Sequence, residues 1–431
     1  MEANPNGYVS QLKNELKGAR PGEFFGFHKP SSIYKVPHRI RQTDPEAYTP
    51  RVISIGPFHK PNGSSGDNVV HQMEKLKLIY LREFLDRTKL SLDNFVFQSQ
   101  DNESWENRIR SRYAGSISLN SDDFLKIIII DACFIIEHFL RVYDCEKWIE
   151  YGDSILQHSW LLSDIKRDLA LLENQLPFFV LEDIYKLTRL PHSVLTISTH
   201  YFLPIDPKVR DLTFSRMTIP PYNFVALVRT ILIPMSIMDV VTEEMGDVSE
   251  HVYSASQLSE AGLVFEVSES KLLLDMSYDD KGVLKMPCLH VDHTTESYMR
   301  NIIAYEECDI SSLKHRFVSQ YFIILDQLIN TEKDVSILVD KKIIVNRLGD
   351  ANEVATMVNN LRKNVTLPRF CERFKFICKR LNDFYENPMN KYKAIFVHEY
   401  FNTPWKIAST VAAVFLLLLT LIQTICSILS L

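Results

Sequence analysis

The longest run of apolar residues lies near the end of the chain, from Ile407 to Leu429, and it contains no charged residue. As a helix, about 23 residues rise by roughly 35 Å, enough to cross a hydrocarbon layer about 30 Å thick. Trp405 and Lys406 stand at its entry, where an indole and a cation prefer the headgroup level. Residues 404–431 are therefore predicted to be a transmembrane anchor. The alternative is a buried core helix, which rarely runs this long without a polar face.

The pattern before the anchor is mostly helical. Apolar residues at spacings of three and four predict a helix over residues 69–87. A second helix is predicted over residues 123–143, with Ser121 as its N-cap, and its apolar centre predicts burial on nearly all faces. Residues 163–187 predict a helix, a break at Pro177 and another helix.

Two stretches resist a helical interpretation. Residues 31–60 carry four prolines and are predicted to hold only short extended pieces. Residues 203–250 contain five prolines and an acidic end, and they predict a long connection with one short apolar helix near residues 225–233. Loops carried on a rigid scaffold often hold binding residues, so this connection is the candidate contact surface.

The period of the pattern changes between residues 263 and 292, where a β patch is predicted. Its strands are Val264–Val267, Lys271–Met276 and Cys288–Val291, with a turn at Asp279–Gly282. A short helix over residues 255–261 precedes the patch. Further helices are predicted over residues 294–306, 312–330, 334–340, 351–363 and 371–402.

These elements predict a mainly α fold with a small β patch, of the α+β class. The predicted order is a tail over residues 1–29, a large helical body over residues 30–403 and the C-terminal transmembrane helix. Scarce glycine, 13 of 431 residues, agrees with helices rather than a turn-rich β architecture. A net charge of −6 argues against nucleic acid as a partner.

The chain begins without an apolar run that could serve as a secretory signal peptide. Lys391, Lys393 and Lys406 flank the predicted span on the side of the body, which favours a cytosol-facing body in a single-pass protein, with the plasma membrane as the expected location. The opposite topology stays open. The possible glycosylation triplets begin at Asn62, Asn102 and Asn364, and chance alone gives about as many.

Candidate chemistry is sparse along the chain. His290, Asp292 and His293 resemble part of a metal site, but a strand would put His293 on the opposite face from the other two, so a polar strand end is the simpler interpretation. Cys133 with Glu137 on one helix face could suggest a thiol nucleophile, but an apolar run raises a thiol pKa and lowers its reactivity.

No motif of the established hydrolase, phosphate-binding or dinucleotide-binding kinds occurs. The seven cysteines lie far apart, and only Cys371 and Cys378 are close, without a second pair at zinc spacing. We therefore predict no catalytic residue, no metal and no cofactor.

The most informative polar cluster is Glu173, Asn174 and Gln175, between apolar Leu172 and Leu176. Polar residues at a helix break can bond the backbone groups that the break leaves without partners. A structural role is the favoured interpretation, and contact with a ligand or partner is the alternative.

Several of these stretches together resemble the plant family called domain of unknown function 247. The resemblance covers about residues 30–431, with mild departures at Ala132 and Tyr305, where the family often has Gly and Phe. The matching pieces are Ile33–Pro37, Ala47–Pro50, Ile53–His59, Met73–Glu74, Lys77, Asp131–Phe134, Asp168, Leu172–Phe179, Ser256–Gly262, Arg300–Glu306, Asp334–Val335, Pro404–Trp405 and Gln423–Thr424.

The resemblance implies a plant protein with a helical body and a C-terminal membrane anchor, without an enzymatic activity that can be carried over by residue. Some grass members are implicated in self-incompatibility, as pollen-side partners of small secreted proteins. Two hypotheses follow. The first is a membrane-anchored interaction or signalling module whose partner is a small secreted or membrane protein. The second is an enzyme, a hydrolase or transferase, with an unfamiliar site.

Overall fold

The computed structural model describes residues 31–59, 69–91, 102–188, 190–202, 220–234, 237, 251–309, 316–366, 369–401 and 403–429. Helices hold 62% of the residues and strands 6%, which confirms the predicted mainly α class with a small β component. The chain divides into two compact units, and each is described by itself. Unit 1 holds residues 1–232, 294–318 and 363–366, and unit 2 holds the remainder.

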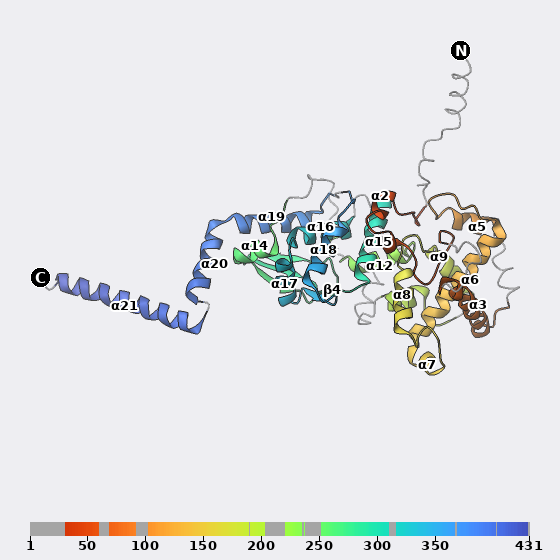
Figure 1. Ribbon diagram of the computed structural model, residues 1–431, viewed down its shortest axis with the longest axis horizontal. Coiled ribbons are helices and arrows are strands. Elements are labelled where there is room, and N and C mark those ends of the chain that lie inside the picture. The colour runs from red at the N-terminus through yellow and green to blue at the C-terminus, as the bar shows by residue number, and fades with distance from the viewer. Residues whose placement is uncertain are drawn as a thin grey trace, which may run out of the picture. The chain divides into compact units, whose positions relative to one another are not determined.

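Unit 1 is built around one long buried helix, α6 (Ser121–Tyr143), labelled in Figure 1. Its residues from Asp131 to Arg141 are all buried, as the apolar pattern predicted. The predicted helix over residues 69–87 is α3 (Val69–Thr88), which packs along α6. The other helices of the unit are α2 (His38–Arg41), η2 (Pro45–Tyr48), α5 (Asn102–Arg110), α7 (Cys145–Glu150), α8 (Ser159–Asp168), α9 (Phe178–Lys186), α10 (Val194–Phe202), α12 (Phe224–Leu232) and α15 (Thr295–Cys308).

The N-cap of α6 is Asn120, so the prediction of Ser121 was wrong. The Asn120 side chain accepts a hydrogen bond from the Asp123 N–H at 2.8 Å. The Ser121 hydroxyl donates instead to Glu106 at 3.1 Å. Both residue types cap helices well, and the neighbouring helix α5 decides between them.

The helix predicted from residue 163 ends earlier than expected. Helix α8 stops at Asp168, and residues 169–177 form a turn-rich loop before α9 begins at Phe178. The break therefore starts well before Pro177. The side chains of Asp168 and Asn174 are bonded to another segment of unit 1, and these long-range contacts override the helical preference of the leucines between them.

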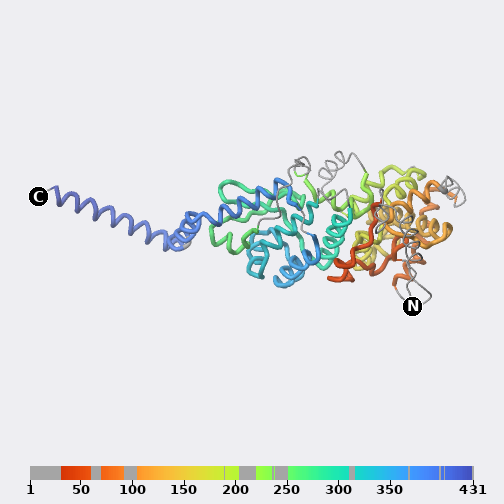
Figure 2. The backbone as a smooth tube through the Cα atoms, turned by 90° about the horizontal axis from the view of Figure 1, so that it is seen from above, coloured from red at the N-terminus to blue at the C-terminus, as the bar shows by residue number. Residues whose placement is uncertain are grey.

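Residues 31–59, here named the strap, carry little regular structure. Apart from α2 and η2, they hold one isolated bridge between Ile33 and Tyr113. The strap is nevertheless largely buried, with Ile33, Ile53 and Ile55 at most 1% exposed. Figure 2 shows it in red beside the teal helix α15. Its backbone polar groups must therefore find partners outside any sheet.

Unit 2 holds the β patch. Strand β1 (Val264–Val267) pairs in parallel with β3 (Val283–Met286), and β2 (Ser277–Asp279) pairs with β3 in the antiparallel sense. A separate parallel pair joins β4 (Leu289–Val291) to β5 (Ile344–Asn346). The strands at 264–267 and 288–291 were predicted nearly as found, and β3 and β5 were missed.

The strand predicted over Lys271–Met276 was wrong. Those residues form a turn, in which the Asp275 N–H bonds to the Leu272 carbonyl and the Met276 N–H to the Leu274 carbonyl. Leu274 and Met276 are fully buried, so the apolar run serves the core without joining the sheet. The antiparallel strand lies just afterwards, at β2.

The helices of unit 2 follow the predicted positions except at the end. They are α14 (Ala255–Glu260), α16 (Phe317–Leu328, which begins in unit 1), α17 (Glu332–Asp340), α18 (Ala351–Leu361), α19 (Glu372–Glu386), α20 (Pro388–Phe401) and α21 (Pro404–Leu429). The single helix predicted over residues 371–402 is two helices. Asn387 is extended because the residue before a proline avoids the helical conformation, and Pro388 starts α20.

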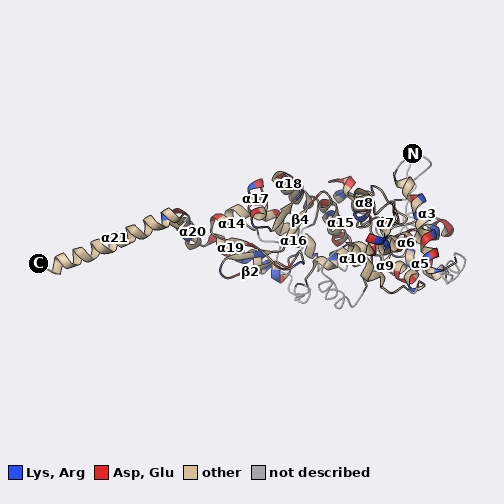
Figure 3. Ribbon diagram, turned by 90° about the horizontal axis from the view of Figure 1, so that it is seen from below, with Lys and Arg blue, Asp and Glu red and all other residues tan. Residues whose placement is uncertain are grey.

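Helix α21 has 26 residues and none of them is buried. It is long and apolar enough to cross a membrane. Figure 3 shows it almost free of charged side chains, and Lys406 near its start is the only charged residue in it.

Candidate functional site

A concentration of buried polar side chains in the described part of unit 1 joins the strap to residues 168–175, and we name it the polar junction. Asp168 lies at the end of α8 and is fully buried. Its carboxylate accepts the N–H groups of Arg51, Val52 and Ile53 at 2.9, 2.8 and 3.0 Å. One side chain thus satisfies three successive backbone N–H groups, which lie outside any strand and have no sheet partner.

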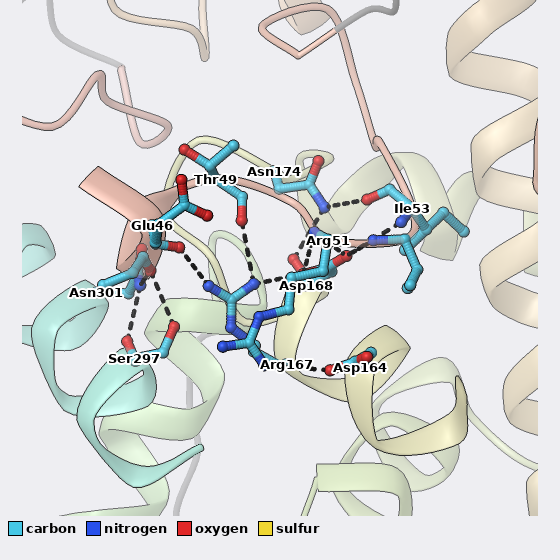
Figure 4. A network of polar contacts seen from close by, with 12 residues as sticks. Glu46, Thr49, Arg51, Ile53, Asp164, Arg167, Asp168, Asn174, Ser297 and Asn301 are labelled. Atoms are coloured by element: carbon cyan, nitrogen blue, oxygen red, sulfur yellow. Dashed lines mark hydrogen bonds and ion pairs between the residues drawn. The ribbon is translucent and has the colours of Figure 1, made fainter. Parts of the chain in front are cut away.

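The Arg167 guanidinium completes this part of the junction. It donates to Asp168 at 2.7 Å and to the carbonyls of Thr49 and Glu46, as Figure 4 shows. The side chain is 1% exposed. Because a buried charge is costly without a partner, the Arg167–Asp168 pair and its backbone contacts depend on one another.

Glu173 binds both ends of the strap. Its carboxylate accepts the Val36 N–H at 2.7 Å and lies 2.6 Å from the Arg41 guanidinium and 3.1 Å from His59 Nε2. Burial alone would raise the pKa of Glu173, but the contacts with His59, Arg41 and the Val36 N–H hold it below its ordinary value. The carboxylate is therefore charged at neutral pH.

The Asn174 side chain makes the hydrogen bonds with the strap backbone that a neighbouring strand would make in a sheet. Its Oδ1 accepts the Ile55 N–H at 2.7 Å, and its Nδ2 donates to the carbonyls of Ile53 and Asp168 at 3.0 and 2.9 Å. An amide side chain offers both a donor and an acceptor, as a backbone peptide does. This explains why Asn suits the position.

Gln175 stabilises the loop itself. Its Nε2 donates to the Leu169 and Leu171 carbonyls, and its Oε1 accepts the Phe224 N–H at 2.9 Å, which joins the loop to α12. Gly56 of the strap passes close by: at φ +72°, a Cβ there would lie 2.7 Å from the Gln175 carbonyl oxygen. Only glycine permits this approach.

A buried lysine of α3 also bonds the strap. Lys77 of α3 is 1% exposed, lies 2.7 Å from Asp131 of α6 and 2.5 Å from Glu74, and donates to the Ser54 carbonyl. Asp131 in turn accepts the Gly56 N–H at 2.8 Å. Burial raises the pKa of Asp131 to about 6, and Lys77 opposes that rise.

The junction also contains a residue whose role the sequence did not reveal. Asn301 of α15 accepts the Leu172 N–H at 2.8 Å and donates to the Ala47 carbonyl at 2.8 Å, beside Ser297, which donates to the same carbonyl. Asn301 therefore bonds both the loop and the strap. An asparagine directly before the apolar run Ile302–Ala304 of a predicted helix is the sequence signal that could have drawn attention to it.

Cys133 and His138 lie in the core of α6 and are both fully buried. Burial raises the pKa of the Cys133 thiol, which opposes a thiolate nucleophile there. His138 Nε2 lies 3.1 Å from the Tyr201 hydroxyl, and its ring stacks on Phe134. Burial lowers the pKa of His138 to about 3, so the ring is neutral near pH 7.

His138 should make folding stability depend on pH. Its pKa is about 3 in the folded state against an ordinary value of 6.5, so between these values the unfolded chain binds more protons. Stability should therefore fall as the pH drops below 6.5, by about 2 kcal/mol at pH 5.

His138→Gln should remove this part of the loss of stability, measured as the change in unfolding free energy between pH 7 and pH 5. His71→Gln on α3 is the matched control, and equal losses in both variants would contradict the assignment.

His290, Asp292 and His293 follow or belong to β4 in unit 2. Across the described ranges, no three His, Cys, Asp or Glu side chains are grouped so as to hold a metal ion. A pair that sequence reasoning missed is Cys288 with His290, whose Sγ and Nε2 are 3.7 Å apart. Burial raises the pKa of the Cys288 thiol, so the pair lacks the lowered thiol pKa of a reactive cysteine.

Trp405 and Lys406 occupy the first turn of α21. Trp405 is 85% exposed, and the Lys406 ammonium lies 4.0 Å from Glu399 of α20. Their exposure at the start of an apolar helix suits residues at a membrane–water interface.

The sequence pattern of one family, described as plant proteins of unknown function, matches residues 33–419. The chain belongs to the DUF247 family. Two relatives from Arabidopsis thaliana carry the name UPF0481 protein, one of them as putative. The first is 29% identical and aligns over 92% of this chain and 86% of its own length, and the second is 25% identical over 91% and 89%. No solved structure matches.

Several of the stretches by which the sequence resembles the family meet at the polar junction. Its contacts come from the stretches that begin at Ile53, Asp131, Asp168, Leu172 and Arg300. Pieces scattered along the sequence thus meet at one place in unit 1. Glu173, Asn174 and Gln175, which were proposed as one cluster, meet three different parts of that unit: both ends of the strap and α12.

Proposed function

We propose that this DUF247 protein is a membrane-anchored interaction module. In this proposal α21 crosses the bilayer, the body binds another protein beside the membrane, and the protein turns over no substrate. The observation that supports it most is the 26-residue apolar helix α21, none of whose residues is buried. Such a helix exposes far more apolar surface than a protein in water normally leaves uncovered, and a bilayer would cover it.

The polar junction supports a scaffold role for the body. The buried charges of Asp168, Lys77 and Glu173 are each bonded to several protein groups, which suits positions that hold a structure together. A rigid scaffold lets loops present a contact surface, and confinement to a membrane raises the effective concentration of a partner on the same surface.

The connection over residues 203–250 stays our candidate for that contact surface. Its centre contains α12 (Phe224–Leu232), close to the predicted helix near residues 225–233, and α12 is nearly all buried. Residues 203–219, 235–236 and 238–250 lie outside the described residues. Since the buried helix α12 at the centre cannot contact a partner, we assign partner contact to the two flanks of the connection, residues 203–219 and 238–250.

We further propose that the body faces the cytosol at the plasma membrane, because Lys391, Lys393 and Lys406 lie on the body side of the span. The partner would be a small secreted or membrane protein if the topology is reversed, and a cytosolic or membrane protein otherwise. A role in recognition such as self-incompatibility rests on the family alone. The alternative function, a hydrolase or transferase, would draw on the Cys288–His290 pair, although the raised pKa of the Cys288 thiol opposes it.

The anchor is tested in membranes prepared from cells that express the full chain. The full chain should stay with the membranes after a carbonate wash, and a chain lacking residues 404–431 should be released. Leu418→Arg in the middle of α21 should weaken insertion, since an arginine there costs about 2.5–3.5 kcal/mol. Lys406→Arg is the matched control and should insert normally. Retention of the truncated chain would overturn the assignment.

Partner binding is tested by exchanging both flanks, residues 203–219 and 238–250, for those of an Arabidopsis relative. The exchange should change which proteins are cross-linked to the chain in native plant membranes, while thermal unfolding stays nearly unchanged. An unaltered set of partners would remove the flanks from the proposal. A purified protein whose turnover is abolished by Cys288→Ser would replace binding with catalysis.

A further inference from the structure

A cavity of about 1420 Å³ lies in unit 2 close to the anchor. Its walls come from the end of α14, the turn between β2 and β3, the end of α19 and one side of α20, and they include Gly262, Lys281, Tyr385, Lys391 and Lys393. At φ +92°, a Cβ on Gly262 would lie 3.1 Å from the Ala394 Cβ. Glycine here lets the end of α14 approach α20, which forms this wall.

The carboxylates that line the cavity are in ion pairs, whereas, among the described residues, its lysines are not. Three carboxylates line the cavity: Asp280 lies 2.6 Å from Arg380, Glu260 lies 2.8 Å from Lys333 and Glu399 lies 4.0 Å from Lys406, so each has a cation beside it. No ion pair within the described part of the chain involves Lys281, Lys391 or Lys393.

The Lys391 ammonium lies 3.8 Å from the centre of the Tyr385 ring, which orients it without neutralising it. Three ammonium groups around one cavity, with their acidic neighbours already paired, favour an anion with several acceptor oxygens. A phosphate group meets that description, because each ammonium offers three donors.

Helix α20 adds a second, independent observation. Met389, Tyr392, Phe396 and Tyr400 recur at helical spacing, lie on one face and are each more than half exposed. We name this face the α20 stripe. Exposed apolar faces of this kind mark contact sites, and tyrosine side chains favour the boundary between apolar and aqueous phases.

The position of α20 in the chain identifies what covers the stripe. Only residues 402 and 403 separate Phe401, the last residue of α20, from Pro404, the first of α21. The Thr410 hydroxyl of α21 donates to the Lys406 carbonyl at 2.7 Å and lies 3.2 Å from the Tyr400 carbonyl oxygen, and the two helices are in contact. A stripe joined so closely to a membrane span lies within reach of the same bilayer.

We propose that the cavity binds the phosphate-bearing headgroup of an anionic phospholipid of that bilayer, with the α20 stripe seated at the headgroup level. Lys281, Lys391 and Lys393 would contact the headgroup, and Tyr392, Phe396 and Tyr400 would enter the interface beside it. This inference rests on the proposed span of α21. It also agrees with a cytosol-facing body, since the cytoplasmic leaflet carries the anionic lipids.

The test uses the full chain in bilayers of phosphatidylcholine mixed with phosphatidylserine. The chain is released in mild detergent, and the lipids that remain bound are counted by native mass spectrometry. Phosphatidylserine should be enriched over the bulk mixture at least about fivefold, the effect of one lysine near an anionic surface. The triple variant Lys281→Gln, Lys391→Gln, Lys393→Gln should bind the two lipids in the bulk ratio.

The matched control removes three exposed lysines of unit 2 that do not line the cavity, by Lys271→Gln, Lys341→Gln and Lys379→Gln. It should keep the enrichment of the natural chain. Equal enrichment in the triple variant would overturn the cavity as the site. Loss of the bound lipid on addition of inorganic phosphate alone would instead identify a site for free phosphate and overturn the lipid assignment.

The stripe has its own variant. Tyr392→Ser with Phe396→Ser should lower the enrichment, whereas Phe376→Ser on α19, which is also exposed, should not. Cross-linking of two chains through residue 396 would show that a second copy covers the stripe and would overturn the membrane contact. Failure of the anchor itself is distinguishable, because the full chain would then leave carbonate-washed bilayers whether or not they contain phosphatidylserine.

Discussion

Asp168→Ala is expected to destabilise unit 1 by about 3–5 kcal/mol, the usual cost of breaking a buried ion pair. The change would leave the Arg167 guanidinium buried without its carboxylate, and it would remove the acceptor of the N–H groups of Arg51, Val52 and Ile53. The measurement is amide hydrogen exchange at residues 51–55 in the full chain, together with thermal unfolding. Exchange there should approach that of the unprotected chain.

Asp164→Ala is the matched control for this experiment. Asp164 lies one turn earlier on α8 and is 3.3 Å from the half-exposed Arg51 side chain. An exposed pair of this kind contributes at most about 1 kcal/mol. If Asp168→Ala cost no more than Asp164→Ala, the junction would not be what holds the strap.

Lys77→Met is expected to destabilise unit 1 by a similar amount, about 3–5 kcal/mol, because the Asp131 carboxylate would stay buried without its cation. Asp131 already has a pKa raised by burial to about 6, and loss of Lys77 would raise it further. A carboxyl whose folded pKa is raised costs the most stability above that pKa, and the cost shrinks as the pH falls toward the ordinary pKa of 3.8. The cost of Lys77→Met should therefore shrink as the pH falls from 8 to 5. Chemical denaturation at both pH values measures it.

Two further variants separate the charge effect from the loss of packing. Lys75→Met removes an exposed lysine of the same helix and should change stability little. Adding Asp131→Asn to Lys77→Met should recover part of the loss, because the amide oxygen can still accept the Gly56 N–H without a charge. A double variant as unstable as the single one would show that the lysine acts through its packing alone.

Helices with one apolar face, such as α3, and helices that are apolar on nearly all faces, such as α6, could be predicted from the sequence. Helices α3 and α6 were predicted within three residues of their ends, because their burial follows directly from apolar spacing. Periodicity does not report contacts with distant segments. The leucines of residues 169–172 have a strong helical preference, yet side chains bonded to the strap end the helix at Asp168.

Only one of the two segments that form the polar junction could be predicted from the sequence. Polar Glu173, Asn174 and Gln175 between apolar neighbours indicated that buried backbone groups there need partners. The sequence could not say which groups, since the Asn174 amide meets Ile53 and Ile55 about 120 positions away. Asn301 escaped notice for the same reason: its partner carbonyl at Ala47 is 254 positions away.

The strap has a consequence for synthesis on the ribosome. Residues 51–53 bond to a carboxylate 115–117 positions further along the chain. At about 5–20 residues per second, that carboxylate is made roughly 6–23 s after the amides that need it. Asn301 arrives later still. During this interval the amides of residues 51–53 lack their acceptor and the apolar strap residues Ile53 and Ile55 lack the cover of α8 and its following loop, so the nascent chain should be a client of chaperones until these have emerged.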